Sequence, residues 1–131
     1  MTVILDADVL IGALDGSDPH HSHARALFTA WQERDESRLM SVVNLSEVLA
    51  GPAADRERLR AARVAIVALG VAVHRPGEAI GVDAARLRRD HPISLSDAYC
   101  LATARHTGSA LASFDQRVQR AARAERIALA G

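Results

Sequence analysis

Short apolar runs alternate along the chain with longer stretches that carry an apolar residue at every third or fourth position. The short runs predict strands of a buried sheet at residues 3–5, 39–43, 71–73, 109–114 and 127–129. The longer stretches predict amphipathic helices at residues 7–14, 20–34, 45–50, 54–69, 78–89, 97–106 and 116–124. Strands that alternate with helices indicate an α/β fold with a mostly parallel central sheet.

Capping and turn residues define where these helices are expected to begin and end. Asn44 is the expected N-cap of the helix at 45–50, and Ser96 that of the helix at 97–106. A turn-forming segment at residues 15–19 stops the first helix, and Gly70 ends the helix before the third strand. No repeat or linker divides the chain, so we expect one domain over residues 1–131.

The composition is that of an ordinary folded protein, with 49% hydrophobic and 24% charged residues. The formal net charge is zero, so bulk charge gives no argument for a nucleic-acid partner. The single cysteine, Cys100, excludes an internal disulfide and fits a reducing compartment. No signal-peptide pattern or long apolar run is present, so a cytoplasmic protein that does not enter the membrane is expected.

Four acidic residues are expected at one edge of the sheet. Asp6 and Asp115 follow predicted strands. Asp97 lies in the first turn of a helix, and Glu47 lies on the polar side of a short helix that follows a strand. The carboxyl ends of parallel strands form the usual ligand crevice. Carboxylates that converge there repel one another unless they are protonated or bridged by cations, and Mg²⁺ or Mn²⁺ prefers such oxygen ligands. A metal ion held in this way suits attack of water on a phosphodiester.

The motifs that carry these acids occur together in a known order. They are residues 3–11 (VILDADVLI), 43–48 (VNLSEV), 94–104 (SLSDAYCLATA) and 112–115 (ASFD). With this ordered set the chain resembles a PIN-domain ribonuclease, and specifically a VapC-type toxin of a bacterial toxin–antitoxin pair. The resemblance covers nearly the whole chain and implies a PIN-like α/β/α sandwich.

The resemblance also implies an activity, a Mg²⁺- or Mn²⁺-dependent endoribonuclease. The acids of the family map onto Asp6, Glu47, Asp97 and Asp115. Asp6 and Asp97 are then metal ligands, Asp115 helps to hold a metal ion or its water, and Glu47 orients the nucleophilic water or a second ion. Two further residues support the site, namely Asp8, an additional carboxylate, and Ser113, which stands where the family has Thr or Ser.

Partners are implied by the same resemblance. A toxin of this kind is paired with a small cognate antitoxin whose tail blocks the acidic site, often through an Arg. The substrate is RNA, with transfer or ribosomal RNA as the expected classes, and a homodimer is common in the family.

Taken singly, each acid has a simpler interpretation. Asp6 could form a turn, Glu47 could be a solvated helix residue, and Asp97 could interact with the dipole of its helix. Asp115 could cap the last helix. His20, His21 and His23 are expected to form a solvated helix start, because no Cys or paired acid stands at metal-ligand spacing.

Two other functions remain as alternatives. Asp6-Ala7-Asp8-Val9 fits the signature of a haloacid-dehalogenase-type phosphatase, but such enzymes use a later basic residue, most often Lys, and all 16 basic residues of this chain are Arg. A phospho-receiver domain needs an essential Lys and fails for the same reason. A PIN fold that binds RNA or protein without catalysis is the second alternative, although such domains usually lose one or more of the acids.

Overall fold

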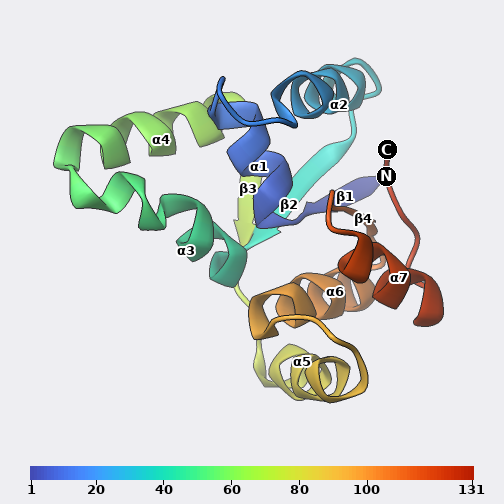
Figure 1. Cartoon of the computed structure of the whole chain (residues 1–131). Coiled ribbons are helices and arrows are strands. Elements are labelled where there is room, and N and C mark those ends of the chain that lie inside the picture. Colours follow the sequence, from blue (N-terminus) through green and yellow to red (C-terminus); the bar gives the residue numbers. More distant parts are fainter.

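The computed structural model describes all residues, 1–131, as four strands and seven α-helices (Figure 1). The strands are β1 (Thr2–Leu5), β2 (Ser37–Ser41), β3 (Val71–His74) and β4 (Ala110–Ala112). The helices are α1 (Ala7–Leu14), α2 (His21–Glu33), α3 (Val42–Ala50), α4 (Arg56–Ala68), α5 (Glu78–Asp90), α6 (Leu95–Thr107) and α7 (Gln116–Ala124). A short 3₁₀ helix at Pro52–Ala54 joins α3 to α4.

The strands form one parallel sheet in the order β3-β2-β1-β4. Strand β1 lies in the interior of the sheet, where Val3 pairs with Arg38 of β2 on one side and with Ala110 of β4 on the other. All the strands are parallel, so their carboxyl ends meet at the same edge. The predicted α/β fold with a parallel central sheet is therefore confirmed.

Helices cover both faces of this sheet because successive side chains of a strand point to opposite faces. Val3 and Leu5 of β1 pack into a core with α1, α2, α3 and α4, where Phe28 and Trp31 are the large side chains. Ile4 packs on the other face into a core with α5, α6 and α7. These two cores make the α/β/α sandwich that the resemblance implied.

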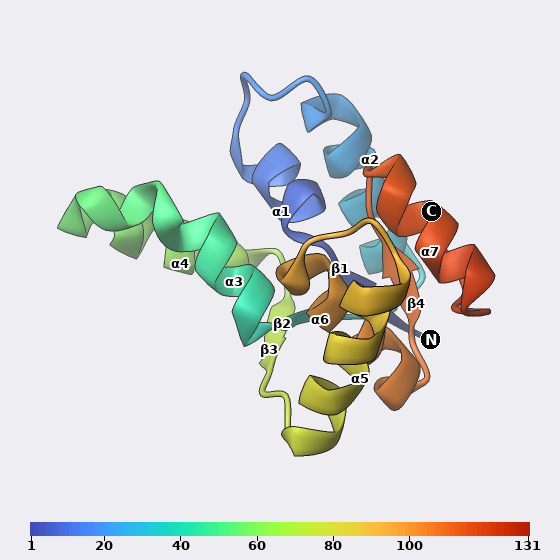
Figure 2. The same cartoon turned by 60° about the horizontal axis from the view of Figure 1, so that its bottom comes forward.

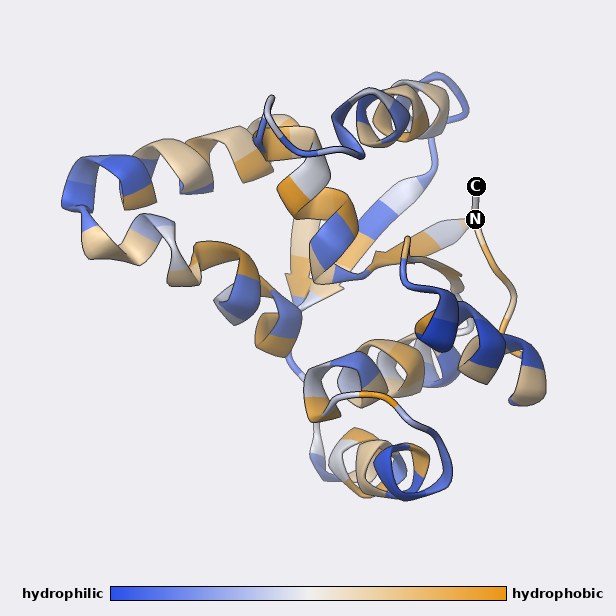
Figure 3. Ribbon diagram, viewed as in Figure 1, coloured by the Kyte–Doolittle hydropathy of each residue, from blue (hydrophilic) through white to orange (hydrophobic).

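Hydropathy differs strongly between the helices. Hydrophobic residues dominate α1 and much of α3, whereas α7 is largely hydrophilic along its ribbon (Figure 3). Only three residues of α7 are buried, Val118, Ala121 and Ala122, so this helix rests on the core through one narrow face. None of the helices combines the length and apolar character needed to cross a membrane.

Three local predictions were wrong. Ser41, not Asn44, is the N-cap of α3, since the strand before it ends earlier than its β-branched residues predict. Ser94, not Ser96, caps α6 through a capping box with Asp97. The strand predicted at residues 127–129 is reduced to one bridge between Leu129 and Leu111.

Candidate active site

Four helices begin at the carboxyl edge of the sheet. The first turns of α1, α3, α6 and α7 lie around the middle of the molecule, where the strands end (Figures 1 and 2). Asp6 and Asp115 come directly before α1 and α7, Asp97 lies in the first turn of α6, and Glu47 lies in the second turn of α3. The edge therefore gathers residues that are far apart in the sequence, as the parallel sheet requires.

Asp6 lies at the centre of this edge, directly after β1. Only 4% of its surface is exposed. Its Oδ1 accepts the N–H of Ala7 at 2.8 Å, and its Oδ2 accepts the hydroxyl of Ser113 at 2.7 Å. Its own N–H donates to the carbonyl of Ala112 and so continues the pairing of β1 with β4. Asp6 is thus fixed from both sides.

Asp8 lies two residues after Asp6, in the first turn of α1. Its Oδ2 accepts the backbone N–H of Phe114 at 3.0 Å, and this bond ties α1 to the segment between β4 and α7. Its Oδ1 is buried and has no hydrogen-bond partner in the protein. A buried carboxylate oxygen that has neither a hydrogen-bond donor nor a positive partner destabilises the folded protein.

Asp115 caps α7 and is joined to Asp6 through Ser113. The Oδ1 of Asp115 accepts the N–H of Arg117 at 2.8 Å. The N–H of Asp115 donates to the Oγ of Ser113 at 3.1 Å, and that same hydroxyl donates to Asp6. Gln119 donates to the carbonyl of Ser113 at 2.7 Å. Ser113 thereby links Asp6 to the start of α7.

Asp97 takes part in the capping box at the start of α6. Its Oδ2 accepts the N–H of Ser94 at 3.1 Å, and its own N–H donates to the Oγ of Ser94 at 3.1 Å. This pairing satisfies two amide groups at the helix end. The carboxylate is half-buried.

Glu47 projects from α3 and is exposed. Its Oε1 accepts the side-chain amide of Asn44 at 3.3 Å, and the same amide donates to the carbonyl of Ser96 at 3.0 Å. Asn44 is fully buried and its Oδ1 has no partner. Sequence reasoning assigned Asn44 only a capping role, although its spacing of three residues from Glu47 is the spacing at which helical side chains meet.

The acids at this edge repel one another. Burial, followed by the negative charge of Asp8, raises the pKa of Asp6 from 3.8 to about 7. Burial raises the pKa of Asp8 from 3.8 to about 6, and Asp115 adds to the effect, while the N–H of Phe114 opposes it. Both carboxylates thus lie in an environment that disfavours their charged forms.

The charges of the same acids also affect Cys100, which lies in α6. Its thiol is fully buried, and its pKa is raised first by that burial and then by the charges of Asp6, Asp97, Asp8 and Glu47. Cys100 itself is the small core residue that the sequence predicted.

A divalent cation fits the chemistry of this cluster. The donors are oxygen atoms of carboxylates, the buried Oδ1 of Asp8 has no partner, and no Lys or Arg forms an ion pair with Asp6 or Asp8. However, no three of the His, Cys, Asp and Glu side chains converge as a ready-made metal site. Asp97 and Asp115 bind the amides of their own helix ends instead.

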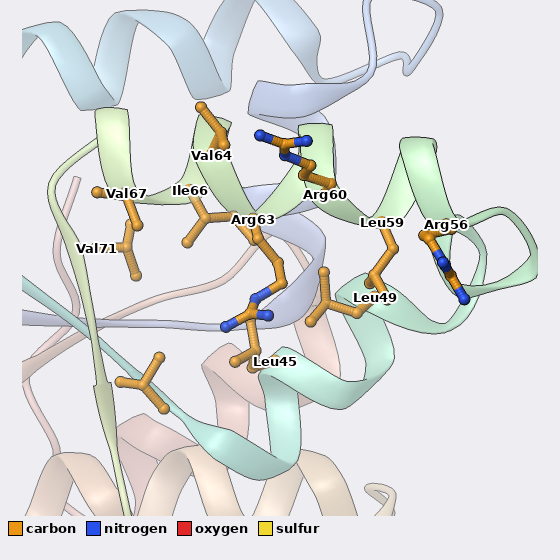
Figure 4. A pocket seen from close by; sticks show the side chains of 11 residues that line it. Leu45, Leu49, Arg56, Leu59, Arg60, Arg63, Val64, Ile66, Val67 and Val71 are labelled. Atoms are coloured by element: carbon orange, nitrogen blue, oxygen red, sulfur yellow. The ribbon is translucent and has the colours of Figure 1, made fainter.

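A second concave feature lies between α3 and α4, on the side away from α6 and α7. It is a groove of about 600 Å³, and eight of its 11 lining residues are hydrophobic. Figure 4 shows Leu45 and Leu49 of α3 facing Leu59 and Arg63 of α4. Val67, also on this groove, is 75% exposed.

Comparison with known proteins identifies the family. The family model of the PIN domain matches residues 3–124. This chain belongs to the PIN domain family. Among curated protein sequences, none matches it significantly. Membership in the PIN family does not favour the phosphatase alternative.

Solved structures resemble this PIN domain along most of its length. VapC20 of Mycobacterium tuberculosis, described as a sarcin–ricin loop cleaving toxin, has a TM-score of 0.74 at 18% identity, covering 91% of this chain and 94% of that one. A toxin–antitoxin complex from Klebsiella pneumoniae has a TM-score of 0.72 at 21% identity, covering 88% of each chain. VapBC2 of Rickettsia felis, bound to a promoter DNA fragment, has a TM-score of 0.74 at 12% identity, covering 99% and 98%. These likenesses show the common fold.

Proposed function

We propose that this PIN domain is a metal-dependent endoribonuclease that acts as the toxin of a toxin–antitoxin pair. The observation that carries the proposal is the pair of acids at the carboxyl edge of the sheet, the buried Asp6 and the half-buried Asp8, neither of which forms an ion pair with Lys or Arg. Isolated buried carboxylates destabilise a fold, and the cost is offset when a cation binds between them. The likeness in fold to VapC20, a nuclease toxin, supports the same conclusion.

Each acid has a proposed role in this site. Asp6, Asp97 and Asp115 hold the Mg²⁺ or Mn²⁺ ion, which when bound neutralises the phosphate and supplies activated water. Ser113 keeps Asp6 and the start of α7 together through its two hydrogen bonds. Glu47 positions the attacking water, and Asn44 holds Glu47 toward the start of α6. Asp8 is the additional oxygen donor that supports the site.

A cleavage assay tests this proposal. Purified wild-type protein, the Asp6→Asn variant and the Asp90→Asn variant are incubated with total cellular RNA, with Mg²⁺, with Mn²⁺ or with a chelator, and the new RNA ends are mapped. Asp90 is an exposed acid of α5 that pairs with Arg89, so its variant is a matched control. We expect discrete cuts that require both the metal ion and Asp6. Cuts that persist in the chelator, or in Asp6→Asn, would refute the assignment.

A cognate antitoxin is the proposed protein partner. Several structural neighbours are toxin–antitoxin complexes, which supports this kind of partner. We place the apolar side of the antitoxin in the groove between α3 and α4, because the groove is hydrophobic and open. Its polar lining consists of three basic residues, Arg56, Arg60 and Arg63, which favours an acidic segment beside the apolar one.

Two matched variants test the position of this partner. Val67 and Val82 are both exposed hydrophobic residues, but Val67 lines the groove on α4 whereas Val82 lies on α5. A candidate small antitoxin protein is co-expressed with wild type, Val67→Glu or Val82→Glu. We expect only Val67→Glu to abolish co-purification. Retention by both variants would place the antitoxin elsewhere, and loss of a homodimer in Val67→Glu alone would assign the groove to a second copy of the chain.

A further inference from the structure

Three aromatic rings from distant parts of the chain meet beside the acidic edge. His20 stacks on Phe114, with ring centroids 4.4 Å apart and planes inclined by 19°. His23 lies against the same phenyl ring, with centroids 5.0 Å apart. His20 and His23 begin α2, while Phe114 joins β4 to α7, and Figure 2 shows α7 beginning beside α2. We call this group, His20, His23 and Phe114, the aromatic shelf.

The aromatic shelf is open to solvent. His20 and His23 are both exposed, and Phe114 is half-buried. The expectation of a solvated helix start was therefore incomplete, since these rings are exposed but pack on a third ring. Exposed aromatic faces in a row are the usual platform on which unpaired nucleobases stack.

The position of the shelf relative to the acids gives it a function. The N–H of Phe114 donates to Asp8 at 3.0 Å, and the residue after Phe114 is Asp115. A nucleic acid whose phosphate lies at these acids brings the adjoining bases over the neighbouring surface. On this side of the acids, that surface consists of the rings of the shelf.

Local contacts order the backbone that carries the two imidazoles before any ligand binds. Asp18 accepts the N–H of His20 at 2.8 Å, and the ring of His21 bonds to the carbonyl of Gly12 at 2.8 Å. A Cβ atom at Gly12 would lie 3.3 Å from the Cβ of Ala24, so α1 and α2 pack closely at this glycine. A surface that is already ordered loses little conformational freedom on binding.

We propose that His20, His23 and Phe114 bind an unpaired nucleobase next to the scissile phosphate, and so restrict the substrate to single-stranded or looped RNA. This inference rests on the proposed nuclease function. The contact is made by the faces of the rings, so it does not depend on the charge of the imidazoles. Base-paired RNA cannot use it, because its bases are already stacked within the helix.

Binding measurements separate stacking from the other roles of these rings. The probe is a fluorescein-labelled oligoadenylate, measured by anisotropy with the Asp97→Asn protein, which is expected not to cleave it. Two double variants are made in that protein. The Leu variant combines His20→Leu with His23→Leu, which keeps apolar cover over Phe114 but removes the flat rings. The Phe variant combines His20→Phe with His23→Phe, which keeps flat rings without charge. Thermal unfolding confirms that both variants are folded.

The stacking contact predicts a distinct pattern. We expect about tenfold weaker binding for the Leu variant, as for the loss of one stacked base, and near wild-type binding for the Phe variant. A second probe is an oligoadenylate that lacks one base. When the missing base is the one that stacks on the shelf, this probe should bind the Phe variant about tenfold more weakly than the intact oligoadenylate does. The Leu variant should bind both probes equally. Equal binding by the Leu variant, or equal loss in both variants, would overturn the inference.

Failure of the aromatic shelf can be distinguished from failure of the nuclease assignment. Metal-dependent cleavage by the wild-type protein, together with unchanged oligoadenylate binding in the Leu variant, would refute the shelf and leave the nuclease standing. Absence of both cleavage and oligoadenylate binding would refute the proposed function and the shelf together. Loss of co-purification with the antitoxin in the Leu variant, at unchanged oligoadenylate binding, would assign the rings to the protein partner instead.

Discussion

Replacing Asp6 by Asn should stabilise the metal-free protein, although Asp6 is proposed to be essential for activity. Asp6 is only 4% exposed and lies beside Asp8 without a positive partner. The charged form of its side chain is therefore disfavoured in the folded protein and not in the unfolded chain. An amide of the same size can keep the hydrogen bond from Ala7 without carrying the charge.

The magnitude follows from the pKa of Asp6, which is about 7 in the folded protein against 3.8 for a free Asp side chain. A pKa raised by about three units corresponds to a cost of about 4 kcal/mol once the carboxyl is ionised in both states. Loss of the hydrogen bond from Ser113 to a charged acceptor removes about 1–2 kcal/mol of that gain. We therefore expect Asp6→Asn to unfold with a free energy about 2–3 kcal/mol higher than wild type at pH 8.

The sign of the pH dependence is fixed by the same pKa. Below about pH 4, Asp6 is protonated in both the folded and the unfolded state, and the cost is absent. As the pH rises from 4 to 7, the unfolded chain loses its proton first, so the stability of the wild type falls. Above pH 7 the full cost is present. The advantage of Asp6→Asn should thus grow from pH 5 to pH 8 and then level off.

Urea unfolding at pH 5, 6, 7 and 8 measures this difference in free energy. It is carried out in chelator and again with Mg²⁺ or Mn²⁺ at ~10 mM, a concentration chosen to saturate even a weak metal site. Asp90→Asn serves as the control, since Asp90 is exposed and its loss affects only the pair with Arg89. The metal ions should stabilise the wild type and not Asp6→Asn. An Asp6→Asn protein that is less stable than wild type at pH 8 in chelator would refute the reasoning.

Four further outcomes follow from the same site. Ser113→Ala should lose about 2 kcal/mol of unfolding free energy in urea, because its hydroxyl holds both Asp6 and the N–H of Asp115, whereas Ser17→Ala, on an exposed loop, should lose little. Asp97→Asn should abolish RNA cleavage while circular dichroism and thermal unfolding stay near wild type, because Asn can still accept the N–H of Ser94; an active or an unfolded variant would contradict the assignment. Gly12→Val should lower the thermal unfolding midpoint by several degrees, since its first side-chain atom already lies 3.3 Å from Ala24, and a Gly51→Val control, with open space around it, should not. Asn44→Leu should reduce cleavage more than stability, because it releases Glu47 from its hydrogen bond, and equal cleavage by wild type and variant would exclude a role for Asn44.

The central part of this fold could be predicted because the sequence pattern and the packing agree there. Val3, Ile4 and Leu5 form an uninterrupted apolar run, and such a run is buried on both faces when helices cover both sides of a sheet. The position of Asp6 at the carboxyl end of that strand follows directly. Asp115 was predicted in the same way from the apolar run before it.

Helix caps were less predictable, because several residues compete for the same role. Ser41, Asn44, Ser94 and Ser96 are all good N-caps in isolation. In the folded chain Ser41 begins α3 although Val42 and Val43 favour strands, so tertiary packing outweighs local preference there. The capping box of Ser94 and Asp97 was detectable from their spacing of three residues.

The aromatic shelf could not be predicted from local sequence. His20 and Phe114 are 94 residues apart, and only the pairing of β1 with β4 brings their segments together. The same holds for the bond of Asn44 to Ser96, which joins α3 to α6. Contacts between distant segments depend on the whole topology, which the hydrophobic pattern does not specify in this detail.

The interior position of β1 has a consequence for the synthesis of this protein. Asp6 is synthesised 107 residues before its partner Ser113, and the strand beside it, β4, is also made long after β1. An incomplete chain can pair β1 with β2 but cannot close the site. A chain that stops before Ser113 therefore has no assembled acidic edge. The edge is complete only when β4 has docked beside β1.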